Sequence, residues 1–154
     1  MQKPLQLKQQ LIEQIPFFQS APEKLVMTTG AGNIVATSAT SLSFEYRYTL
    51  TLSVSNDNAP DESLTDQMVV AILDWLRVNQ PEILGNVTHR LTDFTFVPPG
   101  QALLFTLQLT ERVQVDDENS VRTITHLPEP PLPDNVALPR QVYLNGELIS
   151  SWTE

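Results

Sequence analysis

The sequence contains no cysteine, which excludes a disulfide framework, a thiolate nucleophile and a cysteine-ligated metal. Basic residues are also scarce: nine Lys and Arg stand against 18 Asp and Glu, for a net charge of −9. Nucleic-acid-binding surfaces need clustered cations, so this balance argues against a surface that binds DNA directly.

Long apolar runs are missing as well. No stretch approaches the roughly 20 apolar residues that cross a bilayer, and the first ten residues lack the apolar centre of a signal peptide. We therefore expect no membrane contact, and a protein made in a cytoplasm and used there or assembled there into something larger.

Motifs for catalysis or ligand binding are equally sparse. His89 and His126 have no His or Cys neighbour at metal-ligand spacing. The segment Gly30–Gly32 lacks the third glycine, the helix and the lysine of a phosphate-binding loop. Asp57 and Asp61 lack the alternating oxygen ligands of a calcium loop. The sequence thus predicts no catalytic residue, no metal site and no cofactor.

The dominant feature of the sequence is the stretch Leu42–Val54. Apolar and polar residues alternate strictly along it, which is typical of a half-buried β-strand. At about 3.3 Å per residue this strand would span roughly 40 Å. One predicted face is apolar and consists of Leu42, Phe44, Tyr46, Tyr48, Leu50, Leu52 and Val54.

A second long strand is predicted over Ala102–Val115. Its apolar face is interrupted by Glu111, and its other face is rich in Thr and Gln and carries Arg112. The first long strand carries Arg47 on the corresponding polar face. Glu45 lies two residues from Arg47 on that face, which favours a surface or interface ion pair; Glu45 and Glu111 could form paired carboxylates only if the strands met in register.

Two helices are predicted. Pro4–Ile15 repeats apolar residues at helical spacing and stops before Pro16. The second helix begins with Ser63 as N-cap and Asp66 three residues on, and Pro81 ends it. Its apolar stripe consists of Leu64, Met68, Ala71, Ile72, Trp75 and Leu76.

Three shorter strands complete the predicted domain. Lys24–Thr29 and Asn33–Thr37 flank Gly30–Gly32 and predict a hairpin. A further strand with poor alternation is predicted over Val87–Val97. The order of elements predicts an α+β fold, in which an antiparallel twisted sheet with two long strands carries two helices on one face. The other face would be solvated or would join subunits.

The C-terminal part differs in composition. We expect residues 1–115 to form the α+β domain and residues 116–154 to form a Pro-rich linker and a hairpin arm. The dipeptide Asn145-Gly146 between apolar residues is a strong hairpin signal. A lone two-stranded hairpin is marginal in water, so the arm should rest on this domain or on a neighbouring subunit.

Three motifs in order resemble one family. Ser41–Leu50, Trp75–Glu82 and Leu109–Val113 together are similar to the tail completion protein R family of contractile-tailed temperate coliphages. Lys3–Leu5 and Val142–Glu147 fit this family less distinctively. The resemblance covers residues 1–115 well and the Pro-rich linker weakly.

This resemblance implies a virion structural protein similar to tail terminators. Such proteins form a ring, commonly hexameric, on the head-proximal end of the tail, where the ring stops the tail tube and sheath from growing and prepares the tail for head joining. The implied partners are other copies of the chain, tube and sheath proteins, and head-tail connector proteins. DNA would pass through the lumen without specific binding. No active site belongs to the family, and the implied location is the virion tail, assembled in the bacterial host cytoplasm.

Candidate interface residues lie on the two long strands and in the C-terminal hairpin. For the charged residues of the strands, a structural ion-pair network inside one copy is an equal alternative. A second possible function is a monomeric adaptor or assembly chaperone that binds tail or connector proteins through the C-terminal arm. The candidates are Glu45, Arg47, Thr49, Glu111, Arg112, Tyr143, Asn145 and Gly146.

Overall fold

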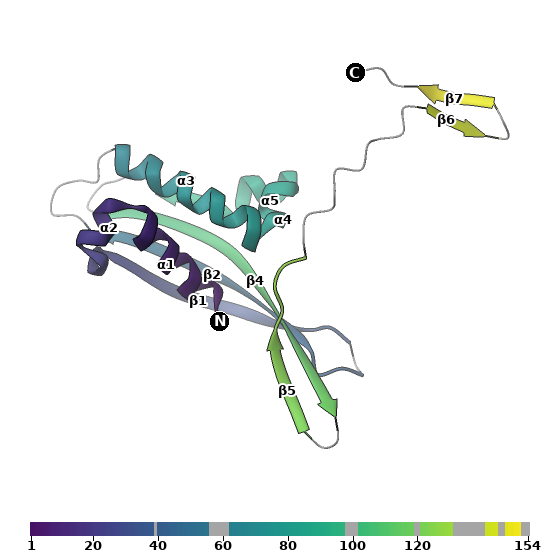
Figure 1. Cartoon of the computed structure of the whole chain (residues 1–154), viewed down its shortest axis with the longest axis horizontal. Helices are drawn as coiled ribbons and strands as arrows, with labels where there is room; N and C mark the ends of the chain where they lie inside the picture. Colours follow the sequence, from purple (N-terminus) through teal and green to yellow (C-terminus); the bar gives the residue numbers. More distant parts are fainter. Residues whose placement is uncertain are drawn as a thin grey trace.

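The computed structural model describes residues 1–38, 40–55, 62–97, 102–118, 121–130, 141–144 and 147–151; beyond residue 130 only the backbone is described. Helices and strands follow one another in a mixed order (Figure 1). In chain order they are α1 (Lys3–Gln14), α2 (Pro16–Ser20), the 3-10 helix η1 (Pro22–Lys24), β1 (Leu25–Ala36), β2 (Phe44–Ser55), α3 (Glu62–Asn79), α4 (Pro81–Gly85), α5 (Val87–Thr92), β3 (Phe94–Val97), β4 (Ala102–Glu118), β5 (Val121–His126), β6 (Gln141–Leu144) and β7 (Glu147–Ser151).

Five strands form one antiparallel sheet in the order β1-β2-β4-β3, with β5 also paired to β4. Val113 of β4 pairs with Phe44 of β2 and with His126 of β5. A residue has one neighbour on each side, so β5 lies along the edge of β4 that faces away from β2. β3 and β5 therefore cover two successive parts of the same edge. The α+β fold with an antiparallel sheet is confirmed.

The two long strands lie side by side at the centre of the sheet. They pair from Phe44↔Val113 to Ser55↔Ala102 without a break in register. The predicted alternation of β2 is confirmed, since Tyr48, Leu50, Leu52 and Val54 are buried. Leu42, by contrast, precedes the strand and is exposed.

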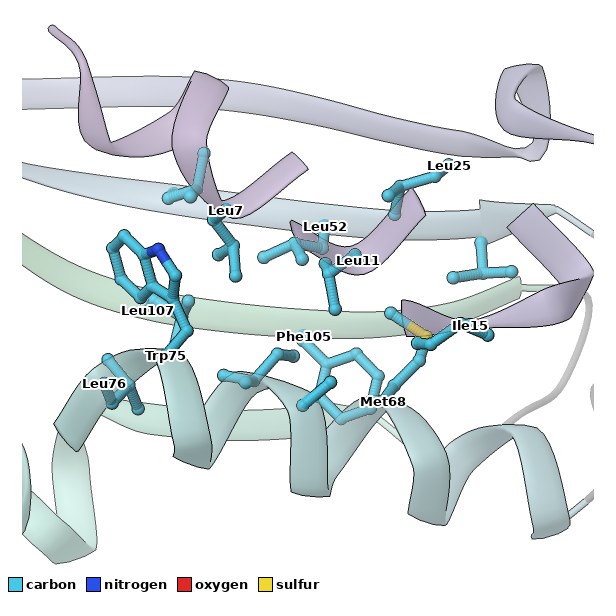
Figure 2. Packing of buried hydrophobic residues seen from close by; sticks show 14 of the residues in the cluster. Leu7, Leu11, Ile15, Leu25, Leu52, Met68, Trp75, Leu76, Phe105 and Leu107 are labelled. Carbon is cyan, nitrogen blue, oxygen red and sulfur yellow. The ribbon is translucent and has the colours of Figure 1, made fainter. Parts of the chain in front are cut away.

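The helices α1 and α3 cover one face of the sheet, here called the helix side (Figure 1). Leu7 and Leu11 of α1 point toward Leu52 and Leu107 of the sheet, and Met68 and Trp75 of α3 enter the same core (Figure 2). All six residues of the predicted apolar stripe of α3 are buried. Ser63 lies inside α3 rather than at its N-cap, because the helix already begins at Glu62.

The predicted hairpin before β2 is wrong. Residues 25–36 form one continuous strand, and Gly30–Gly32 form a bulge where the register with β2 shifts. The close approach of β2 explains the glycine: a Cβ on Gly32 would lie 2.3 Å from the Arg47 carbonyl oxygen. A partner strand across the whole length of β1 overrides the local turn tendency of these residues.

The strand predicted over Val87–Val97 is also wrong in its first half. Val87–Thr92 forms the helix α5, and only Phe94–Val97 is a strand. The Asn86 side chain caps α5, because its oxygen accepts the backbone N–H groups of Thr88 at 2.9 Å and His89 at 3.4 Å. The cap satisfies two N–H groups that a helix start otherwise leaves unpaired.

The sheet continues past residue 115. β4 runs to Glu118, and β5 pairs with its last part. The division into residues 1–115 and 116–154 remains a prediction. β6 and β7 form a separate two-stranded sheet on either side of the predicted Asn145-Gly146 turn. Both turn residues, the prolines of 131–140 and the Asp57–Asp61 loop lie outside the described residues.

Candidate functional site: contact surfaces and a buried polar cluster

A buried carboxylate lies beneath the first turn of α1. Glu111 of β4 is 4% exposed and faces the helix side. Its carboxylate accepts the backbone N–H of Gln2 at 2.8 Å and that of Lys3 at 3.2 Å, and the Tyr48 hydroxyl donates to it as well. His126 Nδ1 lies 3.5 Å from Oε2, the oxygen that accepts the Gln2 N–H. The carboxylate thus joins the N-terminus to both central strands.

Electrostatics at this carboxylate favour the charged form. Burial alone would raise the pKa of Glu111, but the hydrogen bonds from Tyr48, Gln2 and Lys3 together hold it below its ordinary value. Burial, together with the hydrogen bond to Glu111, raises the pKa of the Tyr48 hydroxyl. Tyr48 is therefore a fixed donor at neutral pH, and the pair is suited to structural support.

A lysine extends the cluster toward the C-terminal arm. Lys3 Nζ donates to Gln80 Oε1 at 2.6 Å and to Glu129 Oε1 at 2.7 Å. Burial lowers the pKa of Lys3, and the neighbouring Glu129 carboxylate opposes this shift. Arg112 lies 3.7 Å from the other Glu129 oxygen and donates to the Pro128 carbonyl at 3.4 Å. The first residues after β5 are thereby fixed beside α1 and β4.

Gln80 covers the part of the β4 edge between β3 and β5. Its Nε2 donates to Thr110 Oγ1 at 2.9 Å, and its Oε1 accepts the Thr110 backbone N–H at 3.3 Å. The side chain of Gln80, which directly follows α3, thus takes the place of a strand. The buried polar cluster is defined as the buried residues Lys3, Tyr48, Gln80 and Glu111 together with Gln2 and Glu129 at its rim.

The opposite face of the sheet, here called the open face, carries the other strand candidates. Arg47 Nε lies 2.6 Å from Glu45 Oε1, which confirms the predicted ion pair. Thr49 Oγ1 donates to Gln108 Oε1 at 2.9 Å on the neighbouring strand. Glu45 pairs in register with Arg112, so Glu45 and Glu111 point to opposite faces and form no carboxylate pair.

A hollow of about 400 Å³ opens where β1, β2 and β4 meet α4 and α5. Arg47, Glu82 and His89 are among the residues that line it. His89 Nδ1 lies 2.5 Å from Asp93 Oδ2, so this side chain also has a partner inside the copy. The hollow and the open face together offer a polar surface with fixed side chains.

The candidate residues therefore fall into separate places. Glu45, Arg47 and Thr49 share the open face, and Arg112 supports the start of the arm. For Glu111 the geometry favours the structural alternative, because its oxygens already accept bonds within one copy. Tyr143 lies in β6, where only the backbone is described.

Sequence reasoning missed most of the buried polar cluster. Glu111 gave a signal, because it interrupts an apolar face. Its partner Lys3 comes from a distant segment, and so do Gln80 and Glu129, the side-chain partners of Lys3. Among the residues that the structure describes, no group of His, Cys, Asp and Glu could hold a metal ion. Within the same residues, no helix is both long and apolar enough to cross a membrane.

These features define an α+β protein with a polar open face and a buried polar cluster. Its open face presents fixed polar side chains, and its buried polar cluster holds distant segments of one chain together. The family described as P2 phage tail completion protein R (GpR) matches residues 1–130. The chain is also similar to Tail completion protein R of Escherichia phage P2, with 34% identity over 159 residues and 100% of each chain covered.

The chain belongs to the P2 phage tail completion protein R family. Membership supports a structural role in tail completion, as a component of the virion tail. No solved structure matches the chain.

Proposed function

We propose that this protein completes a contractile phage tail by forming a ring on the head-proximal end of the tail tube and sheath. The observation that carries the proposal is the full-length similarity to a tail completion protein. The ring, of about six copies, stops tube and sheath growth and prepares the tail for head-tail connector proteins. Assembly takes place in the cytoplasm of the host.

The surfaces of one copy support a role in assembly. The ion pair of Glu45 and Arg47 is exposed enough to reach a second protein, since the Arg47 side chain is 60% exposed. Thr49 and Gln108 hold each other in place beside it. Side chains that are already fixed lose less conformational entropy on binding.

The net charge of the chain supports a lumen that DNA can traverse. With a net charge of −9, the protein repels phosphates on average and has few cations to hold them. DNA would pass the ring without specific binding.

The first test is the solution mass of the purified protein, measured by light scattering over a concentration series, alone and with purified tail tubes. A discrete species near six subunits, alone or on the tubes, is the expected result. A protein that stays monomeric in both conditions overturns the ring. Monomers that bind tails or connectors through the arm alone would favour the adaptor function instead.

The second test addresses completion directly. Tails assembled without this protein should be abnormally long or unable to join heads, as seen by electron microscopy. Adding the purified protein during assembly should restore one tail length. Normal tails in its absence would contradict a role in termination.

A further inference from the structure

The edge strand β1 carries a bulge at Gly30–Gly32 but lacks two other features that protect a sheet edge, charged residues and proline. It extends over Leu25–Ala36 and contains no charged residue and no proline. Of the strands that the structure describes, β2 alone pairs with it. Val26 and Ile34 are exposed on it. Such an edge is a template for another strand, and proteins usually block it with charges or proline.

The backbone of β1 offers hydrogen-bonding groups outward. Thr37 N–H donates to the Ser43 carbonyl, so this pair is a hydrogen-bonded pair of the ladder. Because bonded and non-bonded pairs alternate in antiparallel sheets, the Ile34–Tyr46 and Ala36–Phe44 pairs are non-bonded. The N–H and C=O groups of Ile34 and Ala36 therefore point away from β2.

The β5 part of the opposite edge is charged. β5 carries Arg122, which forms an ion pair with Asp117 of β4 at 2.8 Å. Charged side chains along an edge strand disfavour pairing with a further strand. The rest of this edge is β3, an uncharged strand of only four residues. Short edge strands and charges both disfavour pairing, so the 12-residue β1 offers the longer uncharged template.

The C-terminal hairpin is a suitable donor. β6 and β7 form a two-stranded sheet of their own, and such a sheet is marginally stable in water until a further strand or layer supports it. The residues of β6 are uncharged, and β7 contains one charge, Glu147. The uncharged free edge of β1 can therefore supply the third strand that would stabilise this hairpin.

The arm starts on the side of the sheet that lies away from β1. Glu129 and Pro128 are fixed by Lys3 and Arg112, beyond the outer edge of β4. The start of the donor arm and the acceptor strand β1 therefore lie at opposite edges of one copy. A contact between two different surfaces can be repeated from copy to copy. It closes into a ring when the rotation between neighbouring copies permits closure.

We propose that the hairpin β6–β7 of one copy pairs with the free edge of β1 in the next copy and so links the copies of the ring. This inference rests on the proposed ring and specifies its contact. The segment between Pro130 and Gln141 spans at most about 36 Å when extended, a length that allows the hairpin to leave its own copy. The same length would also allow a return to β1 of the same copy, so the test must separate the two.

The test uses the full chain with a photo-reactive phenylalanine analogue in place of Tyr143, mixed with an isotope-labelled copy that lacks the analogue. After assembly and illumination, mass spectrometry identifies the cross-linked peptides. We expect the analogue to be joined to labelled peptides from residues 25–36. Cross-links to the same copy alone, or to other regions of the labelled copy, overturn the inference.

A pair of variants provides an independent readout. Ile34→Lys places a charge on the β1 edge and should reduce the fraction of assembled protein at least tenfold in light scattering. Ile34→Pro removes an outward N–H and should have the same effect, provided circular dichroism shows an intact fold. Ile124→Lys, at a similarly exposed position on β5, is the matched control and should assemble normally.

The outcomes separate this inference from the proposed function. A ring that persists in both Ile34 variants, with no cross-link to β1, overturns the hairpin contact and leaves the ring in place. A wild-type protein that never assembles, even on tail tubes, overturns the ring itself.

Discussion

The hydroxyl of Tyr48 donates a hydrogen bond to the carboxylate of Glu111 across the two central strands of the sheet. Both residues lie on the helix side, where the backbone N–H groups of Gln2 and Lys3 complete the coordination of the carboxylate. A single negative charge thus holds the start of α1 against β2 and β4. Three donors converge on this carboxylate, so its charge is the most strongly bonded in the cluster.

Glu111→Gln should lower the free energy of unfolding by about 2–3 kcal/mol. The amide of Gln has the size of the carboxylate but lacks the negative charge to which three donors bond. Its NH2 group would also face one of those donors. Hydrogen bonds to charged groups contribute about 1.5–3 kcal/mol. Urea unfolding followed by circular dichroism measures the change.

Tyr48→Phe serves as the companion variant and should cost about 1 kcal/mol, because the backbone donors remain. In the double variant the loss should be smaller than the sum of the two single losses, since both changes remove the same hydrogen bond. Additive losses would show that the two residues act independently.

The stability of the protein should fall in acid because of Glu111. Its carboxyl has a lowered pKa in the folded chain and an ordinary value, 4.5, in the unfolded chain. The charged group therefore contributes stability above pH 4.5, and this contribution disappears as the pH falls through the lower, folded value. Unfolding free energies measured between pH 7 and pH 3 should show this loss.

Glu111→Gln is the reference for this experiment, because other carboxyls also titrate. Asp117, for example, has a pKa lowered by its hydrogen bond with Arg122. The difference between wild type and variant should therefore shrink below pH 4.5. A difference that stays constant with pH would exclude the titration of Glu111 as its cause.

The sequence predicts those elements whose pattern is complete within one segment. The alternation along β2 and the apolar stripe of α3 both depend on neighbours in the chain, and both are confirmed. The bulge at Gly30–Gly32 depends on pairing with β2, so the local turn tendency of these residues predicted a hairpin where one continuous strand forms. The same applies to the site: Glu111 stood out as a charge on an apolar face, whereas Glu129 gave no signal because its partner Lys3 is far away in the sequence.

Gly32→Ala should destabilise the fold by about 1–3 kcal/mol, the usual cost of forcing an extra carbon into a packed site. Its Cβ would meet the Arg47 carbonyl oxygen at 2.3 Å, which requires the backbone of β1 or β2 to shift. Thermal and urea unfolding measure the effect.

Gly30→Ala is the matched control in the same bulge. Its Cβ would lie 3.5 Å from the Thr49 carbonyl oxygen, an ordinary contact, so the change should stay within about 0.5 kcal/mol. Equal losses for the two variants would mean that the bulge requires flexibility rather than space at Gly32.

Arg47→Glu should leave the fold intact and prevent ring formation. The side chain is mostly exposed on the open face, so its replacement removes no core contact. The replacement does put a second carboxylate beside Glu45, where Glu45 and Arg47 now form an ion pair at 2.6 Å. These two negative charges would repel an acidic neighbouring copy. Light scattering measures the assembled fraction, and circular dichroism confirms the fold.

Arg77→Glu is the control. Arg77 is exposed on α3, on the helix side, so this variant makes the same charge reversal away from the open face. A normal ring from Arg47→Glu would exclude Arg47 from the interface, whereas loss of assembly in both variants would point to net charge rather than to a contact of the open face.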